Sequence, residues 1–532
     1  MSGLVGTVGP EGLRVAGADV DCVCEGLPGG LEALAQALDL PADLPATELL
    51  AAAFAQRGPR VLDALDGTFA LAVWNRTTRE GMVATDRLGA RSVFVRREGA
   101  QLRFAAEPAE LGAAEPEPAA VSRLLAHGLL ERHETLLRGV ERLPGGEAVV
   151  FRDDRWSHET YWKPQFREPL DIEMDEAADL VRAALERAVA SRCGRQPGVM
   201  LSGGLDSTAV AATAPRTPRL RAYSAVFPGH PQTDESARIA RTAADLGLES
   251  RVRAVHPASV LDALAEHARR WRLPAAAPTL FFQLPLLELA SADGVDTLLD
   301  GQGGDELFGP SPALAEQREP LRERLRGFLR PRSRQPRTLR HPGLVLHDPG
   351  LPEGLRLDGP SWWTSLADLL TGVREQAGIH DHLRRKMAWC GLTGGHPLLD
   401  DLPLIELVLR LPPRLALDGS LDRPVLRAAL RGLVGDHVRL RPTKMPFDRL
   451  LVDSLLGSDR QVLPSLLDPR SARVAAFVRP DLLARFADPP PPEKATLPWV
   501  WTAWRLAAVE LWLRELASER FVVEQARAAV NS

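Results

Sequence analysis

Hydrophobic and polar residues alternate in short runs over the first 165 positions, and Gly and Pro residues separate these runs. Such alternation predicts β-strands, because every second side chain of a strand faces the same side of its sheet. Helical stretches at about 47–56 and 117–127 interrupt the runs. The predicted strands are 4–8, 68–74, 81–85, 92–95, 102–106 and 148–151. This order indicates a layered α+β domain and not a regular βαβ alternation.

From about residue 172 the pattern changes to strands that lead into helices, beginning with an amphipathic helix over 173–191. The predicted strands are 198–201, 220–226, 250–255 and 297–300, with helices at 207–214, 233–246, 258–271 and 280–292. That order predicts a parallel sheet covered by helices on both faces, with ligands at the carboxyl ends of its strands. The rest of the chain is mainly helical and includes a Trp-rich helix at about 495–517.

The two patterns predict two domains, 1–165 and 172–532, since 532 residues exceed one typical core. An Arg- and Pro-rich stretch at about 312–345 favours an exposed segment within the second domain. The net charge of -5 gives no reason to expect a nucleic-acid partner. Four scattered cysteines suggest neither a disulfide framework nor a zinc site, and no apolar run has the length of a membrane span. A cytoplasmic protein without a membrane partner is the expectation, since the first residues lack a signal-peptide pattern.

The sharpest local motif is Ser202-Gly203-Gly204-Leu205-Asp206-Ser207-Thr208, which follows a predicted strand and opens a predicted helix. Small residues there let backbone N–H groups close around an anion at a helix N-terminus. No Gly-Lys-Ser/Thr sequence follows, so the loop differs from a Walker A loop. The pattern favours a loop that grips pyrophosphate when ATP is split into AMP and pyrophosphate. The alternative is a turn with no ligand.

A second Gly-rich segment, Asp300-Gly301-Gln302-Gly303-Gly304-Asp305-Glu306, also begins at the end of a predicted strand. A triphosphate needs counter-charge, which Mg²⁺ held by one or two carboxylates commonly supplies. Asp206 and Asp305 are therefore the candidate metal ligands. The alternative for this segment is an N-capped helix start with acids that complement the helix dipole.

Two weaker candidates lie further along the chain. Lys444 is one of only four lysines among 65 basic residues, and a cation there could stabilise charge at the α-phosphate. A solvated surface lysine is the alternative. His396, in the segment His-Pro-Leu-Leu-Asp, either begins a helix or lines an acceptor pocket.

These motifs resemble the asparagine synthetase superfamily over nearly the whole chain. The matching segments are SGGLDST, DGQGGDELFG, HPLLD at 396–400, DGTFALA at 66–72 and DRLGAR at 86–91. The resemblance implies an N-terminal αββα domain of the Ntn-hydrolase type and a C-terminal domain that adenylates a carboxylate with ATP and Mg²⁺. It also implies that Lys444, Asp206 and Asp305 carry catalysis, with Asp206 and Asp305 as metal ligands. The predicted ATP- and pyrophosphate-binding residues are Leu201, Ser202, Gly203, Gly204, Asp206, Ser207, Thr208, Val226, Gly301 and Gln302, and Gln302 and His396 are the predicted substrate contacts.

Departures from the family pattern bear on the nitrogen source. Glutaminase members use a processed N-terminal cysteine, whereas position 2 here is Ser2. The glutamine-binding Asn-Gly-Glu segment is unrecognisable, and residues 24–28 stand in its place. The resemblance therefore implies a degenerate glutaminase domain and an amine already present on a substrate as the nucleophile.

Family branches without glutaminase include β-lactam synthetases and the macrolactam synthetases that close lasso peptides. The β-lactam branch uses a tyrosine where this chain has Gln302, and the two tyrosines, Tyr161 and Tyr223, lie elsewhere. Residues 421–427, residues 444–448 and the Trp-rich tail are most similar to lasso peptide cyclases. That branch adenylates an Asp or Glu side chain of a precursor peptide and joins it to the peptide's own α-amine, whose unperturbed pKa is about 8.

The resemblance implies a precursor peptide as substrate, with a leader-binding protein and a leader peptidase as partners. The sequence shows no clear general base. Two other functions stay open: a small-molecule ligase of the β-lactam or ammonia-dependent asparagine synthetase type, and a non-catalytic scaffold that binds nucleotide or peptide.

Overall fold

The computed structural model describes residues 4–526, apart from nine gaps of one to thirty residues. The gaps are 42, 216–219, 232, 257–258, 310–339, 374–375, 417–420, 443–446 and 520, together with the side chain of Leu27. Ser2, Lys444 and most of the predicted exposed segment 312–345 therefore lie outside the described residues.

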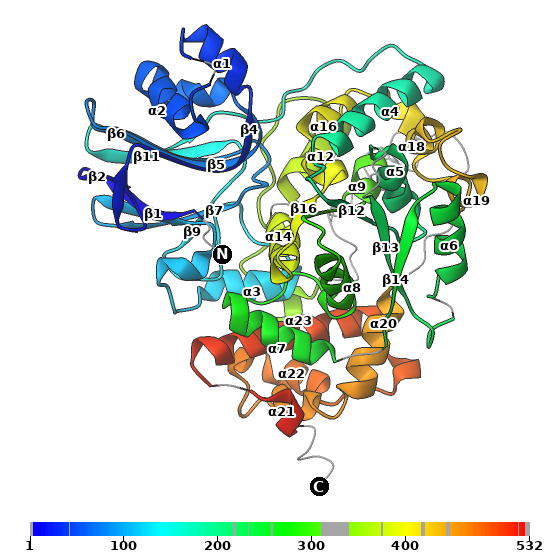
Figure 1. Ribbon diagram of the computed structural model, residues 1–532. Helices are drawn as coiled ribbons and strands as arrows, with labels where there is room; N and C mark the ends of the chain where they lie inside the picture. The colour runs from blue at the N-terminus through cyan, green and yellow to red at the C-terminus, as the bar shows by residue number, and fades with distance from the viewer. Residues whose placement is uncertain are drawn as a thin grey trace.

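The N-terminal domain contains two stacked antiparallel sheets (Figure 1). The six-stranded sheet has the order β3 (Ala18–Val20), β2 (Gly12–Val15), β1 (Val5–Gly9), β8 (Gln101–Ala105), β7 (Val93–Glu98) and β9 (Glu141–Leu143). The five-stranded sheet has the order β11 (Arg155–Thr160), β10 (Glu147–Arg152), β6 (Glu80–Thr85), β5 (Asp66–Asn75) and β4 (Cys22–Gly29).

Strand β5 shows how the sequence sets these layers. Its even-numbered residues from Ala70 to Trp74 pack between the two sheets, and its odd-numbered residues from Phe69 to Val73 pack against helices α1 (Leu31–Ala37) and α2 (Ala46–Arg57). Both faces of the strand are apolar because both are buried. Helix α3 (Pro118–His127) covers the other face of the six-stranded sheet. The layers thus lie in the predicted order of helix, sheet, sheet and helix.

The second domain is built on one parallel sheet, as the strand–helix pattern predicted. Its order is β14 (Glu249–Ala254), β13 (Arg221–Val226), β12 (Pro197–Met200), β15 (Thr297–Leu299) and β16 (Thr393–Gly395). Helices α4 (Met174–Ala190), α5 (Leu205–Thr213) and α6 (Ser236–Asp245) pack on one face, and α8 (Leu280–Ala292) and α14 (Ile379–Trp389) pack on the other.

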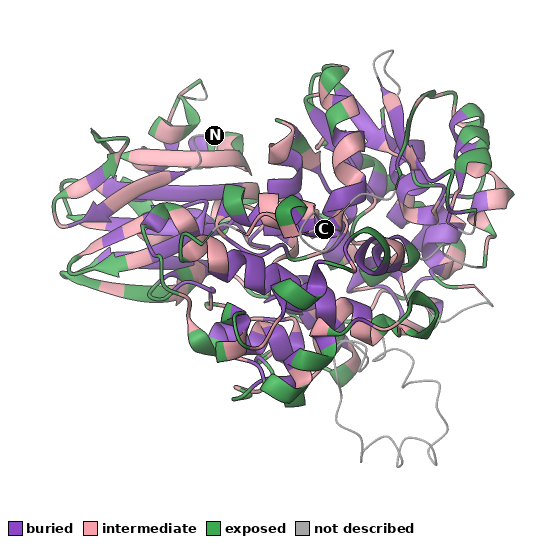
Figure 2. Ribbon diagram, turned by 90° about the horizontal axis from the view of Figure 1, so that it is seen from below, coloured by how far each residue is buried: buried purple, intermediate pink, exposed green. Residues whose placement is uncertain are grey.

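A layer formed by α7 (Val260–Trp271) and by helices from the C-terminal part of the chain lies below α8 in Figure 1 and continues the core. These C-terminal helices are α20 (Asp448–Asp453), α21 (Leu463–Leu466), α22 (Pro480–Ala487) and α23 (Leu497–Leu516). Helix α23 is the Trp-rich helix, and it is buried along most of its length. Figure 2 shows the buried residues on the inner elements and the exposed residues on the outer surface. Among the described helices none is both long enough and apolar enough to cross a membrane.

Shorter elements complete the described part of the chain. The remaining α-helices are α9 (Gly304–Phe308), α12 (Ser361–Asp368), α15 (Pro397–Asp400), α16 (Leu402–Val408), α17 (Pro413–Ala416), α18 (Pro424–Ala429) and α19 (Asp436–Arg439). Short 3₁₀ segments occur at Gly58–Ala64, Pro108–Leu111, Pro342–Leu344, Arg473–Ala476 and Pro492–Lys494, and π-helical turns at Leu369–Val373 and Ser454–Ser458.

Candidate functional site

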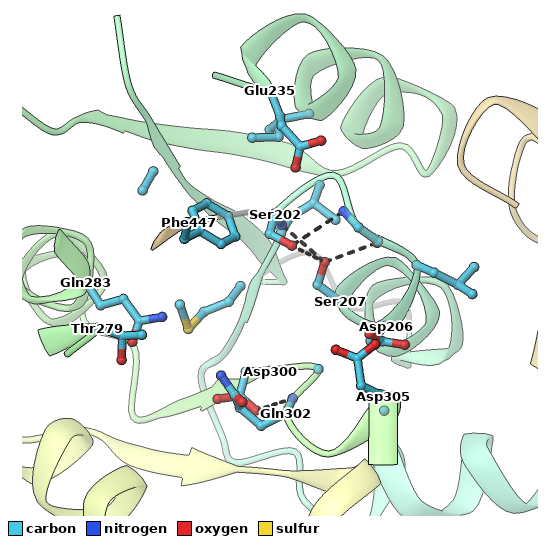
Figure 3. A pocket seen from close by; sticks show the side chains of 18 of the residues that line it. Ser202, Asp206, Ser207, Glu235, Thr279, Gln283, Asp300, Gln302, Asp305 and Phe447 are labelled. Atoms are coloured by element: carbon cyan, nitrogen blue, oxygen red, sulfur yellow. Dashed lines mark hydrogen bonds between the residues drawn. The ribbon is translucent and has the colours of Figure 1, made fainter. Parts of the chain in front are cut away.

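The chain reverses its path across the parallel sheet between β12 and β15. It runs outward from β12 to β13 and β14 and then returns to place β15 on the other side of β12. Neighbouring loops separate to opposite faces at such a reversal, which opens a crevice at the carboxyl ends of the strands. Residues 201–204 leave β12 there, and residues 300–303 leave β15. Both Gly-rich loops therefore flank one crevice (Figure 3).

The first loop folds tightly over the start of helix α5. The Ser202 N–H donates to Ser207 Oγ at 3.1 Å, and the two serine hydroxyl oxygens are 3.0 Å apart. Thr208 Oγ1 donates to the Gly204 carbonyl at 2.7 Å. Gly203 has a φ of 75°, in the left-handed region that favours glycine. The loop presents the N-terminus of a nine-residue helix to the crevice, and the first N–H groups of a helix attract anions.

The second loop touches the first at positions that only glycine can occupy. A Cβ on Gly301 would lie 2.5 Å from the Ser207 nitrogen, and one on Gly304 would lie 2.5 Å from the carboxyl carbon of Asp206. Gly303 has a φ of 92° and precedes helix α9. The glycines thus allow the Asp206 carboxylate to approach the backbone of the second loop, which carries Asp305.

A buried guanidinium bridges these two carboxylates. Arg423 Nη1 donates to both oxygens of Asp206, at 2.8 and 2.7 Å, and to Asp305 Oδ1 at 2.8 Å. The Arg423 side chain is only 5 % exposed, and Nη2 lies 2.8 Å from Asp422. Burial lowers the pKa of Arg423, but the charges of Asp206 and Asp305 outweigh it and raise the pKa above its usual value. A cation therefore sits between the two predicted metal ligands.

A cavity of about 400 Å³ extends from these charges to an aromatic wall. Phe282 stacks on Phe447 with ring centroids 5.8 Å apart, and Phe227 lies about 6 Å from both. Thr279 and Gln283, one turn apart on α8, add neutral polar groups (Figure 3). The cavity thus has a charged end that suits phosphates and an apolar end that suits a larger organic group.

Ionisable groups are also buried in the cavity wall, at Asp300, and behind it. Asp300 Oδ1 accepts from the Gln302 N–H at 3.1 Å and lies 2.9 Å from His396 Nδ1. Burial raises the pKa of Asp300, but His396 opposes it and the net pKa is below the usual value; burial lowers the pKa of His396, but Asp300 raises it overall. The pair is therefore held as an ion pair. Lys386 Nζ donates to Gln283 Oε1 at 2.9 Å, and burial lowers the lysine pKa.

The orientation of Gln283 follows from that contact. A lysine ammonium has only donors, so the carbonyl of Gln283 must face Lys386 and the amide NH₂ is turned toward the cavity. Helix α8 therefore presents a hydrogen-bond donor to whatever occupies the cavity.

The predicted site residues fall into three groups. The cavity is lined by Leu201, Ser202, Gly204, Asp206, Ser207, Gly301, Gln302 and Asp305. Gly203 and Thr208 shape the first loop without lining the cavity. The Val226 side chain packs in the core, whereas its neighbours Ala225 and Phe227 line the cavity.

The two weaker candidates are placed less directly. His396 lies behind Asp300 and lines a second cavity of about 400 Å³, between the two domains, so it does not line the first cavity. Lys444 falls in the gap 443–446, outside the described residues. The sequence assigned no role to Arg423, Gln283 or Lys386. Arg423 lies in the segment 421–427 that resembles lasso peptide cyclases, and Lys386 is one of only four lysines.

The N-terminal domain contains no ionised thiol among its described cysteines. Burial raises the pKa of Cys22 and Cys24, the latter to about 11, and neighbouring acids raise both further. The two tyrosine hydroxyls are also engaged: Tyr161 donates to the Thr85 carbonyl at 2.7 Å and Tyr223 to Asp293 at 3.1 Å. Tyr223 forms part of the cavity wall, but its hydroxyl donates to Asp293, which does not line the cavity.

Comparison with known proteins places the chain in a family. The asparagine synthase model matches residues 180–514, and a glutamine amidotransferase domain model matches residues 40–162. The chain belongs to the asparagine synthase family. Its architecture is a glutamine amidotransferase-like domain followed by a synthetase domain, and both Gly-rich loops lie within the synthetase match.

The relatives share part of their length with this chain. A Mycobacterium tuberculosis protein named "Putative asparagine synthetase (glutamine-hydrolyzing)" is 32 % identical over 328 residues, which cover 58 % of this chain and 48 % of the relative. Asparagine synthetase (glutamine-hydrolyzing) 1 of Bacillus subtilis is 28 % identical over 323 residues, with the same coverage. The chain spans about half the length of these curated relatives. The match to a solved glutamine phosphoribosylpyrophosphate amidotransferase of B. subtilis covers 52 % of this chain and 60 % of that protein, at 13 % identity. The TM-score is 0.19, too low to support an argument about the fold.

Proposed function

We propose that this protein is an ATP-dependent carbon–nitrogen ligase that activates a carboxylate as an acyl-adenylate and passes the acyl group to an amine. The observation that carries the proposal is the convergence of two Gly-rich loops at the reversal point of the parallel sheet. They bring a helix N-terminus and two carboxylates to one end of a single cavity. Membership of the asparagine synthase family supports the same reaction class.

The residues present fit Mg²⁺ as a cofactor. Carboxylate oxygens are the ligands that Mg²⁺ prefers, and Arg423 already shows that Asp206 and Asp305 can share one cation. The glycine at 304 is the condition for this, since a Cβ would overlap the Asp206 carboxylate. When bound, Mg²⁺ would neutralise charge on the triphosphate and on the departing pyrophosphate.

The chain's own residues can hold the reactants in place. The N-terminus of α5 and the loop 201–204 offer N–H groups to the phosphates. Attack of the substrate carboxylate on the α-phosphate releases pyrophosphate, and attack of the amine on the acyl carbon releases AMP. The donor NH₂ of Gln283 is placed to hold a carbonyl oxygen in the cavity. Held in this way, acyl and amine groups react with an effective concentration that can reach about 10⁵ M.

For the acyl acceptor we propose an amine that belongs to a substrate and not ammonia from glutamine. The sequence departure at residues 24–28 supports this, because the glutamine-binding segment of the family is unrecognisable there. The finer proposal is a lasso peptide cyclase, which joins an Asp or Glu side chain to the peptide's own N-terminus. Its support is the sequence resemblance of residues 421–427 and of the Trp-rich helix α23. A precursor peptide, a leader-binding protein and a leader peptidase are the proposed partners.

The test is release of pyrophosphate and AMP by purified protein with Mg²⁺ and ATP. Three substrates are compared: a leader-free peptide with a free N-terminal amine and an internal Asp or Glu, aspartate with ammonia, and carboxyethylated amino acids. Turnover with the peptide and loss of one water from its mass would support the cyclase. Turnover only with a small acid would assign a small-molecule ligase, and turnover with none would contradict the ligase proposal for these substrates.

Two variants make this assay specific. Asp206→Ala removes a proposed metal ligand and should abolish turnover. Asp245→Ala is the matched control, because Asp245 lies at the end of α6, half-exposed, and forms a long ion pair of 3.7 Å with His437. Equal turnover in the two variants would remove Asp206 from the mechanism.

A further inference from the structure

Arg423 differs from the other arginines of the cavity in the partners that it holds. Arg427 donates to the carbonyl and a carboxylate oxygen of Asp422, and Arg441 pairs with Glu235. Each of these two arginines is thus paired with an acid other than Asp206 and Asp305. Arg423 instead bridges Asp206 and Asp305, the two carboxylates proposed to hold Mg²⁺.

The guanidinium and a metal ion compete for the same oxygens. Arg423 Nη1 lies 2.7–2.8 Å from three carboxylate oxygens of these two acids. Mg²⁺ binds oxygen at about 2.1 Å and would occupy the space between the same atoms. Both cations cannot lie there, so binding of the metal requires Arg423 to leave at least one of the two carboxylates.

The backbone at Arg423 indicates that this arrangement is held by its side chain. Arg423 has φ 56° and ψ 48°, in the left-handed region that residues other than glycine rarely adopt, and it directly precedes Pro424 at the start of α18. Its side chain is buried, and its contacts with Asp206, Asp305 and Asp422 offset the strain. When two of these contacts are lost, the left-handed backbone conformation of Arg423 is less stabilised.

Charge balance identifies the next partner. Without ligand, Asp206 and Asp305 carry two negative charges against the single positive charge of Arg423. Mg²⁺ with ATP adds about two further net negative charges, carried by phosphate oxygens in the same cavity. A guanidinium displaced from carboxylates binds phosphate oxygens with the same forked geometry. Asp422 already has Arg427 as a second partner, so the phosphates are the stronger attraction.

We propose that Arg423 is a phosphate-binding residue that holds the two metal-binding carboxylates together in the nucleotide-free protein and transfers to the triphosphate when Mg²⁺ takes them over. This inference rests on the ligase proposal above. It explains how two acids that face each other are kept in place before the metal arrives. It also couples metal binding to nucleotide binding, because without the phosphates the released guanidinium keeps only Asp422, which it shares with Arg427.

The test measures binding without any acyl or amine substrate. Mn²⁺ serves as the probe for the metal site, followed by its electron paramagnetic resonance, and a non-hydrolysable ATP analogue serves as the nucleotide. In Arg423→Gln we expect Mn²⁺ to bind the nucleotide-free protein about tenfold more tightly, because the competing cation is gone. We expect the analogue with Mn²⁺ to bind about tenfold more weakly, because one phosphate contact is lost.

Two further variants keep the result interpretable. Arg431→Gln, on the exposed end of the same segment and paired only loosely with Asp175, should match the wild type in both measurements. If Arg423→Gln does not fold, Arg423→Lys keeps the charge but lacks the fork, and smaller shifts in the same two directions are expected. Unchanged Mn²⁺ affinity in the nucleotide-free variant, or unchanged analogue affinity, overturns the proposal. Neither readout depends on turnover, so a failed ligase assay and a failed role for Arg423 remain distinguishable.

Discussion

A buried ion-pair network joins the two domains, and breaking it at Asp381 should have a large effect on stability. Asp381, on α14 of the synthetase domain, contacts Arg142 of the N-terminal domain and lies 3.5 Å from Arg384. Glu107 of the N-terminal domain holds Arg384 at 2.6 Å and Arg385 at 2.9 Å. The Asp381 side chain is 3 % exposed, so removal of its charge leaves buried guanidinium groups without a full set of partners.

The expected magnitude comes from the cost of an unpaired buried charge. Removal of one partner from a buried pair destabilises a protein by about 3–5 kcal/mol, whereas an exposed pair contributes about 0–1 kcal/mol. Asp381→Asn should therefore lower the free energy of unfolding by about 3 kcal/mol or more. The matched control is Asp481→Asn, because Asp481 pairs with Arg479 at 3.2 Å and both side chains are more than half exposed. The control should change the unfolding free energy by less than about 1 kcal/mol.

The low pKa of Asp381 also predicts how the stability difference between wild type and Asp381→Asn depends on pH. Burial raises the pKa of Asp381, but Arg142, Arg385 and Arg384 outweigh burial and hold the pKa well below its usual range. A depressed pKa contributes stability that is present above the unfolded pKa of about 4 and is lost as the pH falls below it. Urea unfolding at several pH values between 5.5 and 8 should give a constant difference between wild type and Asp381→Asn. A difference no larger than that of the control, or one that varies strongly across this range, would refute the reasoning.

Three further predictions concern the site and the N-terminal domain. Gly304→Ala should reduce ATP-dependent pyrophosphate release by about 10²-fold, because its Cβ would displace the Asp206 carboxylate, while Gly343→Ala, with open space around it, should leave the rate unchanged. The destabilisation caused by His396→Gln, measured by urea unfolding, should be largest below about pH 6.5 and shrink as the pH rises through the raised pKa of His396, since the protonated imidazole is the form that Asp300 stabilises. Alkylation of Cys24 by iodoacetamide at pH 7.5 should be far slower than that of a free thiol because its pKa is about 11, and rapid labelling would contradict the raised pKa.

Elements with a clear hydrophobic period could be predicted from the sequence. The parallel strands β12 to β15 and helices α4 to α8 lie within about three residues of their expected bounds. Most of them have one strongly apolar face or two, whereas β14, at the edge of the sheet, is largely exposed. Strand β4 was not expected, since Gly26 and Pro28 within Cys22–Gly29 are typical of turns. It forms because it lies at the edge of the five-stranded sheet and pairs along its full length with β5. The three-residue strands β3, β9 and β16 are too short to show a period.

The residues of the candidate site also differ in whether the sequence alone identifies them. Residues in contiguous motifs could be found from the sequence, because both loops carry their glycines and acids in order. Arg423 belongs to the segment 421–427 that resembles lasso peptide cyclases, but its role could not be found, because arginine dominates the basic residues and nothing in the sequence pairs Arg423 with the two acids. Its role depends on three separate segments, around 206, 305 and 423, meeting at one point. The strand order of the parallel sheet brings the first two together, and Arg423 reaches them from the start of α18, which packs against α4 and α9.

The buried pair of Asp300 and His396 shows what such long-range assembly adds to the reaction. Asp300 belongs to the second loop, and His396 follows β16, the strand next to β15. Their contact at 2.9 Å fixes the loop that carries Gly301 and Gln302 to the neighbouring strand. A loop that grips phosphates by backbone N–H groups works only if those groups are held before the ligand arrives, because any ordering on binding would weaken the grip. His396 therefore acts on the cavity through Asp300, although it does not line the cavity itself.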